Sequence, residues 1–101
     1  MQYQQKLDDI ERRFEELTEQ MADPAVISDS AQYRKVSKAH NDLSEIVTKY
    51  REWKTANRNL QDARAMLGES DEDIRAMAQE EIARTEPELT RFEEELKFLM
   101  L

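Results

Sequence analysis

The stretch from Met21 to Leu43, MADPAVISDSAQYRKVSKAHNDL, decides the fold because it separates two long helical patterns. Before it, apolar residues recur every three or four positions, which places their side chains on one face of a helix. They are Tyr3, Leu7, Ile10, Phe14, Leu17 and Met21. Asp23 precedes Pro24 and is therefore pushed out of the helical region of backbone space. We expect the first helix to span residues 2–22 and to stop at this pair.

The second helix begins inside the same stretch. Three consecutive residues have side-chain oxygens that can accept the unpaired N–H groups of a first helical turn, namely Ser28, Asp29 and Ser30. The apolar face that follows comprises Tyr33, Val36, His40, Leu43, Val47 and Tyr50. It then drifts by one position to Ile46, Tyr50, Trp53, Asn57, Leu60, Arg64 and Leu67, as expected for a helix with neighbours on two sides. Gly68 can adopt the left-handed conformation that ends many helices, so we expect this helix over residues 30–67.

A third helix follows, and its start is marked by Ser70 and Asp73, which form a capping-box pattern. Its apolar face comprises Ile74, Ala78, Ile82, Thr85, Leu89, Phe92, Leu96 and Leu99. Pro87 lies inside the helix and removes one backbone hydrogen bond, at a cost of about 3 kcal/mol. Because the apolar face continues across Pro87, we expect one kinked helix over residues 71–100 rather than two separate helices.

The lengths of these helices constrain how they pack. At a rise of about 1.5 Å per residue the three helices would be about 30, 57 and 47 Å long, and short connections make successive helices antiparallel. The first helix can therefore cover only residues 30–50 of the second. We predict an all-α fold, an antiparallel three-helix bundle that extends into a two-helix coiled-coil arm tipped by residues 67–71. The whole chain, 1–101, would form a single helical domain.

The distribution of charge supports this arrangement. Residues 1–23 carry three basic and seven acidic side chains, residues 30–67 eight basic and four acidic, and residues 69–101 four basic and eleven acidic. A basic central helix between two acidic ones favours these pairings over a pairing of the first helix with the third. The formal net charge of −8 argues against autonomous nucleic-acid binding by the domain.

Composition and motifs exclude most kinds of active site. The chain has no Cys, hence no disulfide or thiolate metal site, and its one Gly cannot build a phosphate-binding loop. His40 is the only histidine, and Ser37 stands where the Glu of a di-iron Glu-x-x-His pair would be, so we expect a structural role. Consecutive acidic residues such as Glu80 and Glu81 point in different directions on a helix. We expect no catalytic residue, cofactor or metal, and not an enzyme.

Two features stay open on sequence grounds alone. Tyr50 and Trp53 could form an exposed recognition patch, although packing in the core is the simpler interpretation. The basic strip of Arg34, Lys35 and Lys38 could contact RNA phosphate. Pairing of this strip with the acidic flanking helices is the simpler interpretation. The chain lacks a secretory signal and any run of about 18 apolar residues, so we expect a soluble cytosolic protein.

The segment DPAVISDSAQYRKVSK resembles the pattern Asp-Pro-x-Val-Ile-Ser-Asp-x-x-x-Tyr/Phe-Arg-x-x-Ser-Lys of the N-terminal domain of bacterial class-I peptide chain release factors. The matching positions are Asp23, Pro24, Val26, Ile27, Ser28, Asp29, Tyr33, Arg34, Ser37 and Lys38. The similarity continues through residues 50–54 and 77–81 to residues 95–99, so it covers essentially the whole chain. The Val-Ile-Ser-Asp form is most similar to the release factor 1 branch, which reads the stop codons UAA and UAG.

The chain also departs from that family in what it lacks. The family's hydrolytic Gly-Gly-Gln motif is absent because Gly68 is the only glycine, and neither proline begins the codon-reading Pro-x-Thr motif. The apolar end, residues 98–101, suggests a fragment of a longer protein. The resemblance implies an accessory domain of a termination factor that projects toward the ribosomal stalk base and ribosomal protein L11. The alternative is a stand-alone coiled-coil adaptor or dimerisation module, with the face near Trp53 and Leu60 as its interface.

Overall fold

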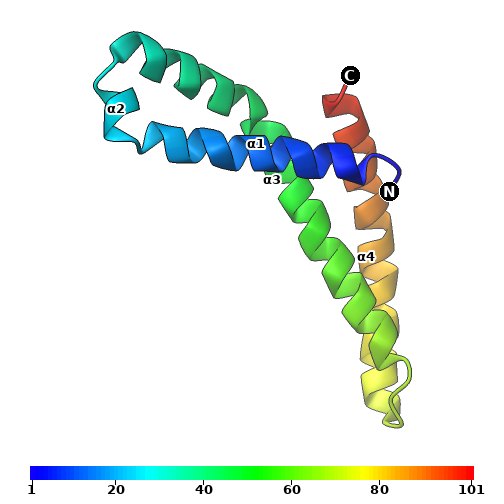
Figure 1. Cartoon of the computed structure of the whole chain (residues 1–101). Helices are drawn as coiled ribbons and strands as arrows, with labels where there is room; N and C mark the ends of the chain where they lie inside the picture. The colour runs from blue at the N-terminus through cyan, green and yellow to red at the C-terminus, as the bar shows by residue number, and fades with distance from the viewer. The chain divides into compact units, whose positions relative to one another are not determined.

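The computed structural model describes residues 1–101 and contains four α-helices and no β-strand. In chain order these are α1 (Gln4–Met21), α2 (Pro24–Ile27), α3 (Ser30–Met66) and α4 (Glu72–Leu99) (Figure 1). The predicted all-α class is confirmed. The three long helices occupy the segments expected at 2–22, 30–67 and 71–100, with ends that differ by one or two residues.

The short helix α2 was not expected, because the Asp23–Pro24 pair was interpreted only as the end of the first helix. The same pair also begins a helix. Asp23 has an extended backbone, and its carboxylate accepts a hydrogen bond from the Ala25 N–H at 2.9 Å. Pro24 takes the first helical position, where its missing N–H costs nothing. The chain therefore turns through one capped helical turn rather than an irregular loop.

The structure consists of two compact units, residues 1–48 and residues 49–101. In the first unit α1 and the N-terminal part of α3 lie side by side, and α2 joins them at one end (Figure 1). In the second unit the C-terminal part of α3 lies beside α4, and a turn after Met66 joins the two helices (Figure 1). Each unit is an antiparallel helical hairpin. The packing of the first predicted helix with the third into a bundle stays a prediction, as does the single domain.

The core of the first unit contains Leu17, Val26 and Val36, and α2 contributes one of these three. Met21, Ala39 and Leu43 pack against this cluster. Tyr33 was predicted to begin the buried face of the second helix, and this is wrong, because its side chain is 37% exposed. The reason is the unforeseen α2, which supplies Val26 to this end of the core and leaves Tyr33 on the outside.

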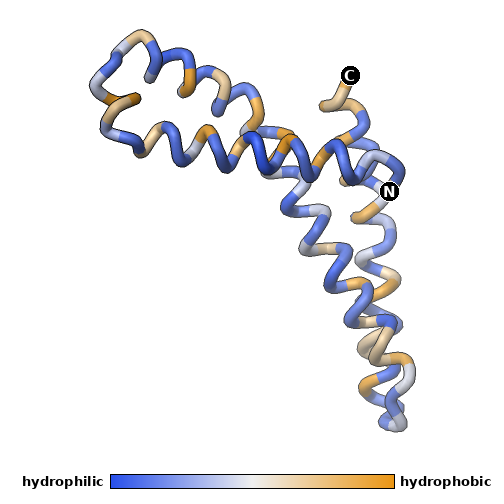
Figure 2. Tube along the Cα trace, in the orientation of Figure 1, coloured by the Kyte–Doolittle hydropathy of each residue, from blue (hydrophilic) through white to orange (hydrophobic).

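The buried positions of the second unit follow the predicted faces along most of their length. On α4 they are Ala78, Thr85, Leu89, Phe92 and Leu96, and on α3 they are Tyr50, Trp53, Ala56, Leu60 and Ala63. Arg64 and Leu67 were predicted in this face and are instead exposed. In this part of α3 the small residues Ala56 and Ala63 lie on the buried side. The exposed Arg64 guanidinium lies 3.4 Å from the Glu86 carboxylate of α4. Along each helix apolar residues alternate with polar ones (Figure 2).

The turn between α3 and α4 differs from the prediction in two details. Gly68 does not have a positive φ angle. The chain instead leaves α3 through tight turns, in which Leu67, Gly68 and Glu69 donate N–H hydrogen bonds to carbonyls three residues earlier. The N-cap of α4 is Asp71 rather than Ser70, because the Asp71 carboxylate accepts from the N–H groups of Asp73 and Ile74. As predicted, α4 continues through Pro87 as one helix.

Candidate functional site

The ten residues of the sequence fingerprint fall into two groups in the structure. The first group builds the turn between α1 and α3 and comprises Asp23, Pro24, Val26, Ser28 and Asp29. The Asp29 carboxylate accepts the Gln32 N–H at 3.1 Å, so Asp29 is the N-cap among the three candidates. The Ser28 hydroxyl donates to the Ala25 carbonyl at 3.1 Å. Through these hydrogen bonds the residues shape the backbone of the turn.

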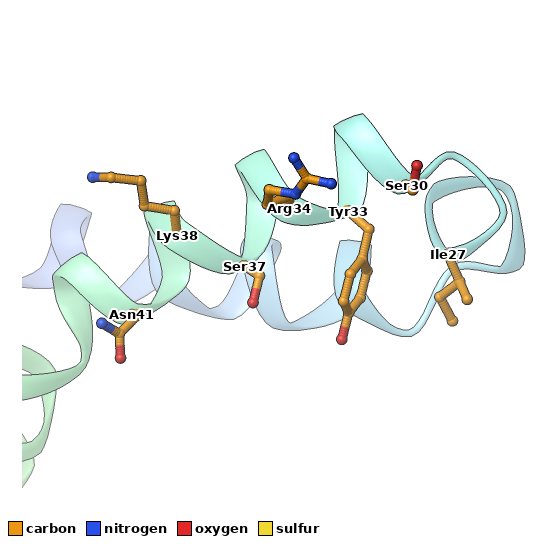
Figure 3. A pocket seen from close by; sticks show the side chains of 7 residues that line it. All are labelled: Ile27, Ser30, Tyr33, Arg34, Ser37, Lys38 and Asn41. Atoms are coloured by element: carbon orange, nitrogen blue, oxygen red, sulfur yellow. The ribbon is translucent and has the colours of Figure 1, made fainter.

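The second group lies on the surface and lines a shallow hollow of about 440 Å³. It comprises Ile27, Tyr33, Arg34, Ser37 and Lys38, and the hollow is completed by Ser30 and Asn41 (Figure 3). Figure 3 shows Ile27, Tyr33, Ser37 and Asn41 pointing to the same side, while Arg34 and Lys38 project from the neighbouring strip of the helix. A spacing of four residues along α3 produces this alignment, since such residues share a helix face.

The charges of this surface are less compensated than the sequence suggested. Lys38 forms an ion pair with Asp42 at 3.0 Å, one turn along the same helix, and both side chains are exposed. Arg34 and Lys35 are also exposed, and neither forms an ion pair. The interpretation that this strip pairs with the acidic flanking helices is therefore wrong for Arg34 and Lys35. Because exposed charges keep their hydration, both cations are available to an anionic partner.

His40 has a structural role, as expected. Its ring stacks on the ring of Phe14 with centroids 4.2 Å apart. The Thr18 hydroxyl donates to the Phe14 carbonyl at 3.0 Å, and the His40 Nε2 atom lies 3.0 Å from that hydroxyl oxygen. An Nε2–H group would complete this hydrogen bond. The contact holds α1 against α3 within the first unit.

Tyr50 and Trp53 do not form an exposed recognition patch. Both are buried, Trp53 with 4% exposure, and their rings stack with centroids 5.9 Å apart. The interpretation as core residues is confirmed. The Trp53 Nε1–H has no hydrogen-bond acceptor, so packing rather than a polar contact holds this ring. The face near Trp53 and Leu60, which the alternative hypothesis requires as an interface, is not exposed, because Leu60 is also buried, with 3% exposure.

The surface of the first unit can form ion pairs and hydrogen bonds. No group of three or more His, Asp or Glu side chains is arranged to hold a metal ion. No helix of this structure has both the length and the hydropathy that crossing a membrane requires. Ser30 and Asn41, which also line the hollow, were not predicted as surface-site residues. The sequence did contain a pattern that placed Asn41 on the same helix face, since it follows Tyr33 and Ser37 at intervals of four residues.

The fold defines a class of protein, an all-α domain built from two helical hairpins. Residues 10–101 match the family model of the PCRF domain, and the chain belongs to this family. It is similar to peptide chain release factor 1 of Acidobacterium capsulatum, with 45% identity over 97 residues that cover 96% of this chain and 27% of the relative. The resemblance to release factors is thereby confirmed.

Two further relatives give the same picture. Peptide chain release factor 1 of Nitratidesulfovibrio vulgaris is 45% identical over 96 residues, 95% of this chain and 27% of the relative. That of Syntrophomonas wolfei is 43% identical over 98 residues, 96% of this chain and 28% of the relative. The chain thus spans little more than a quarter of the length of these curated relatives. No solved structure matches the chain.

Proposed function

We propose that this chain is the N-terminal accessory domain of a cytoplasmic translation-termination factor that recognises the stop codons UAA and UAG. The observation that carries the proposal is the 45% identity to a peptide chain release factor 1 over 96% of this chain. In the complete factor this domain would help to position the protein on the ribosome, near the stalk base and ribosomal protein L11. Codon reading and peptidyl-tRNA hydrolysis would belong to other domains.

The geometry supports a positioning role rather than a chemical one. The first unit exposes Arg34 without an ion pair, and Arg34 lines the hollow together with the polar side chains of Ser37 and Asn41. Lys35 is likewise exposed without an ion pair but does not line the hollow. Phosphate groups and protein carboxylates both accept hydrogen bonds from such cations. The net charge of −8 opposes binding of nucleic acid by the isolated chain, so the contact would form only when the rest of the factor docks.

The second hypothesis, a stand-alone coiled-coil adaptor or dimerisation module, gains no support. It requires an accessible apolar face on α3 near Trp53 and Leu60. Both side chains are buried within the folded chain. The face that would have formed a dimer is therefore already covered.

A chimeric release factor tests the positioning role. The N-terminal region of a bacterial release factor 1 would be replaced by this chain, and peptide release would be measured on ribosomes programmed with UAA, UAG or UGA. We expect release at UAA and UAG with a KM close to that of the intact factor. A chimera carrying an unrelated helical hairpin of equal length should show a higher KM with little change in kcat.

The outcome that contradicts positioning is equal activity of the two chimeras. The codon assignment has a separate test, which is to sequence the coding region beyond Leu101. We expect a Pro-x-Thr motif followed by Gly-Gly-Gln. A downstream region without Gly-Gly-Gln would exclude a parent release factor of this class.

A further inference from the structure

The tip of the second unit exposes an unusual number of large apolar side chains. Met66 and Leu67 lie at the end of α3, and Ile74 and Met77 lie in the first two turns of α4. Met66 is 49% exposed and Met77 is 70% exposed. Hydrophobic positions flank the turn between the two helices in Figure 2. We call these four residues the tip patch.

The tip patch borders a hollow that both helices form. Met66 and Met77 line this hollow, which has a volume of about 290 Å³. Ala63 of α3 and Ala78 of α4 also line it, and both are buried. Because alanine side chains are short, the hollow has an apolar floor between two flexible methionines. Methionine adapts its shape to different apolar groups and is enriched at protein-binding surfaces.

The rim of the hollow is acidic. Asp62 and Glu81 lie on it, together with Asn59. Asp62 is exposed and forms no ion pair, whereas Glu81 pairs with Arg84 at 2.6 Å. Four of the five residues at positions 69–73 are also acidic. This surface would repel the phosphates of RNA, and it would also repel the same acidic surface of a second copy.

We propose that the tip patch binds a basic amphipathic helix of a partner protein. An apolar side chain of that helix enters the hollow between Met66 and Met77, and its Lys or Arg side chains face Asp62 and Glu81. Opposite charges steer the encounter, and the buried apolar contact provides most of the affinity. The proposal rests on the proposed function only in that it places the partner on or near the ribosome. The chemistry of the tip patch does not depend on the proposed function.

The test uses the complete chain with labelled methionine methyl groups and a synthetic helical peptide. The peptide carries leucines on one face and lysines on the other. The sequence contains five methionines, so the methyl signals of Met66 and Met77 can be compared with those of Met1, Met21 and Met100. We expect the first two signals to shift on titration and the other three to stay unchanged.

Variants and control ligands make the result specific. Met66→Gln combined with Met77→Gln should weaken peptide binding about tenfold, as expected for removal of a central contact. Phe98→Gln changes an exposed apolar residue at the opposite end of α4 and should leave binding unchanged. A peptide with glutamates in place of the lysines should not bind. Circular dichroism confirms that each variant folds.

Three outcomes would overturn the proposal. They are equal binding of the acidic peptide, shifts spread over all five methyl signals, and preferential binding of an RNA oligonucleotide at the tip. The assay contains no ribosome, so a negative result leaves the release-factor proposal intact. Conversely, failure of the chimeric factor would leave a positive peptide result standing.

Discussion

Single aspartates begin three of the helices, and each one shows how a residue acts on the backbone around it. The carboxylates of Asp23, Asp29 and Asp71 accept backbone N–H groups at 2.9, 3.1 and 2.8 Å. Sequence patterns placed the cap of α4 at Ser70, one residue too early. Both residue types can cap a helix, so only the path of the backbone decides which side chain reaches the free N–H groups.

Replacing Asp71 tests this assignment. Asp71→Ala removes the acceptor for the N–H groups of Asp73 and Ile74 and should lower the free energy of unfolding by about 1 kcal/mol. Ser70→Ala is the matched control, since the Ser70 side chain caps nothing, and its effect should stay within about 0.5 kcal/mol. Urea denaturation measures both values. A larger loss for Ser70→Ala would show that the serine is the cap.

Lys49 provides a prediction about pH. Its ammonium group contacts Glu95 at 2.9 Å and Glu52 at 3.0 Å, and these hydrogen bonds, with Glu95 first, raise the pKa of Lys49 above its ordinary value. A raised folded-state pKa means that the stabilisation is complete below the unfolded pKa, about 10.4. It is lost as the pH rises through the higher folded-state value.

We therefore expect Lys49→Gln to lower the free energy of unfolding by about 0.5 kcal/mol at neutral pH. The difference from the unsubstituted chain should begin to shrink above about pH 10.4, where Lys49 of the unfolded chain loses its proton, and should vanish once the pH passes the raised folded-state pKa. Urea denaturation across this range measures it. Lys35→Gln is the control, because Lys35 forms no ion pair. A Lys49→Gln difference that persists undiminished at alkaline pH would assign the effect to packing over Phe92 instead.

At the scale of the elements, helix positions follow from local patterns, while the buried faces depend on what each helix meets. Val36, Val47 and Leu60 are buried as their spacing predicted. Ala56 and Ala63 were missed because their short side chains carry little hydropathy. They are buried because small residues allow a neighbouring helix to approach closely. Both continue the spacing of the buried face, since Trp53, Ala56, Leu60 and Ala63 lie three, four and three residues apart, so the sequence did contain this pattern.

Gly68 distinguishes two ways of ending α3. A left-handed glycine would make Gly68→Ala destabilising, whereas the structure shows no positive φ. A Cβ atom at this position would lie 3.6 Å from the Ala65 carbonyl oxygen, an ordinary contact. Gly68→Ala should therefore raise the free energy of unfolding by about 0.5 kcal/mol, because alanine restricts the unfolded chain. Thermal unfolding measures the change. A clear loss of stability would indicate that Gly68 adopts the left-handed conformation at the end of α3.

Pro87 lies in the interior of α4 and leaves one carbonyl without its helical partner. Pro87→Ala should raise the free energy of unfolding by about 2 kcal/mol, since the cost of proline in a helix exceeds the stiffness that it gives the unfolded chain. Glu80→Ala, an exposed substitution in the same helix, should change stability by less than about 0.5 kcal/mol. A less stable Pro87→Ala chain would mean that the proline ring itself packs in the fold.

At the scale of the whole molecule, charge selects which helices pair. The basic α3 contacts the acidic α4 through the ion pairs Lys49–Glu95 and Arg64–Glu86, as the charge distribution predicted. These pairs are partly exposed, so they contribute more to the choice of neighbour than to stability. Charge also acts locally, since several ion pairs join residues three or four positions apart on one helix.

The isolated chain should be a monomer at micromolar concentration. The apolar face of α3 near Trp53 and Leu60 is buried, and a net charge of −8 makes copies repel one another. Analytical ultracentrifugation measures the mass. Raising the salt concentration tests the two reasons separately, because salt screens the charge but leaves the buried face covered. A dimer that forms at every salt concentration would contradict the burial of this face.

The sequence by itself determined the all-α class, the positions of the three long helices and the membership in the PCRF domain family. Helical period, caps and motifs are local properties, and a local property can be read from neighbouring residues. Tertiary structure alone decided that Ile27, Tyr33, Arg34, Ser37 and Lys38 line a hollow. It also decided that Met66 and Met77 stay exposed at the tip. Spacing within a helix predicts which residues share a face, but the distant segments that meet that face decide where burial stops, as the exposure of Tyr33 and Leu67 shows.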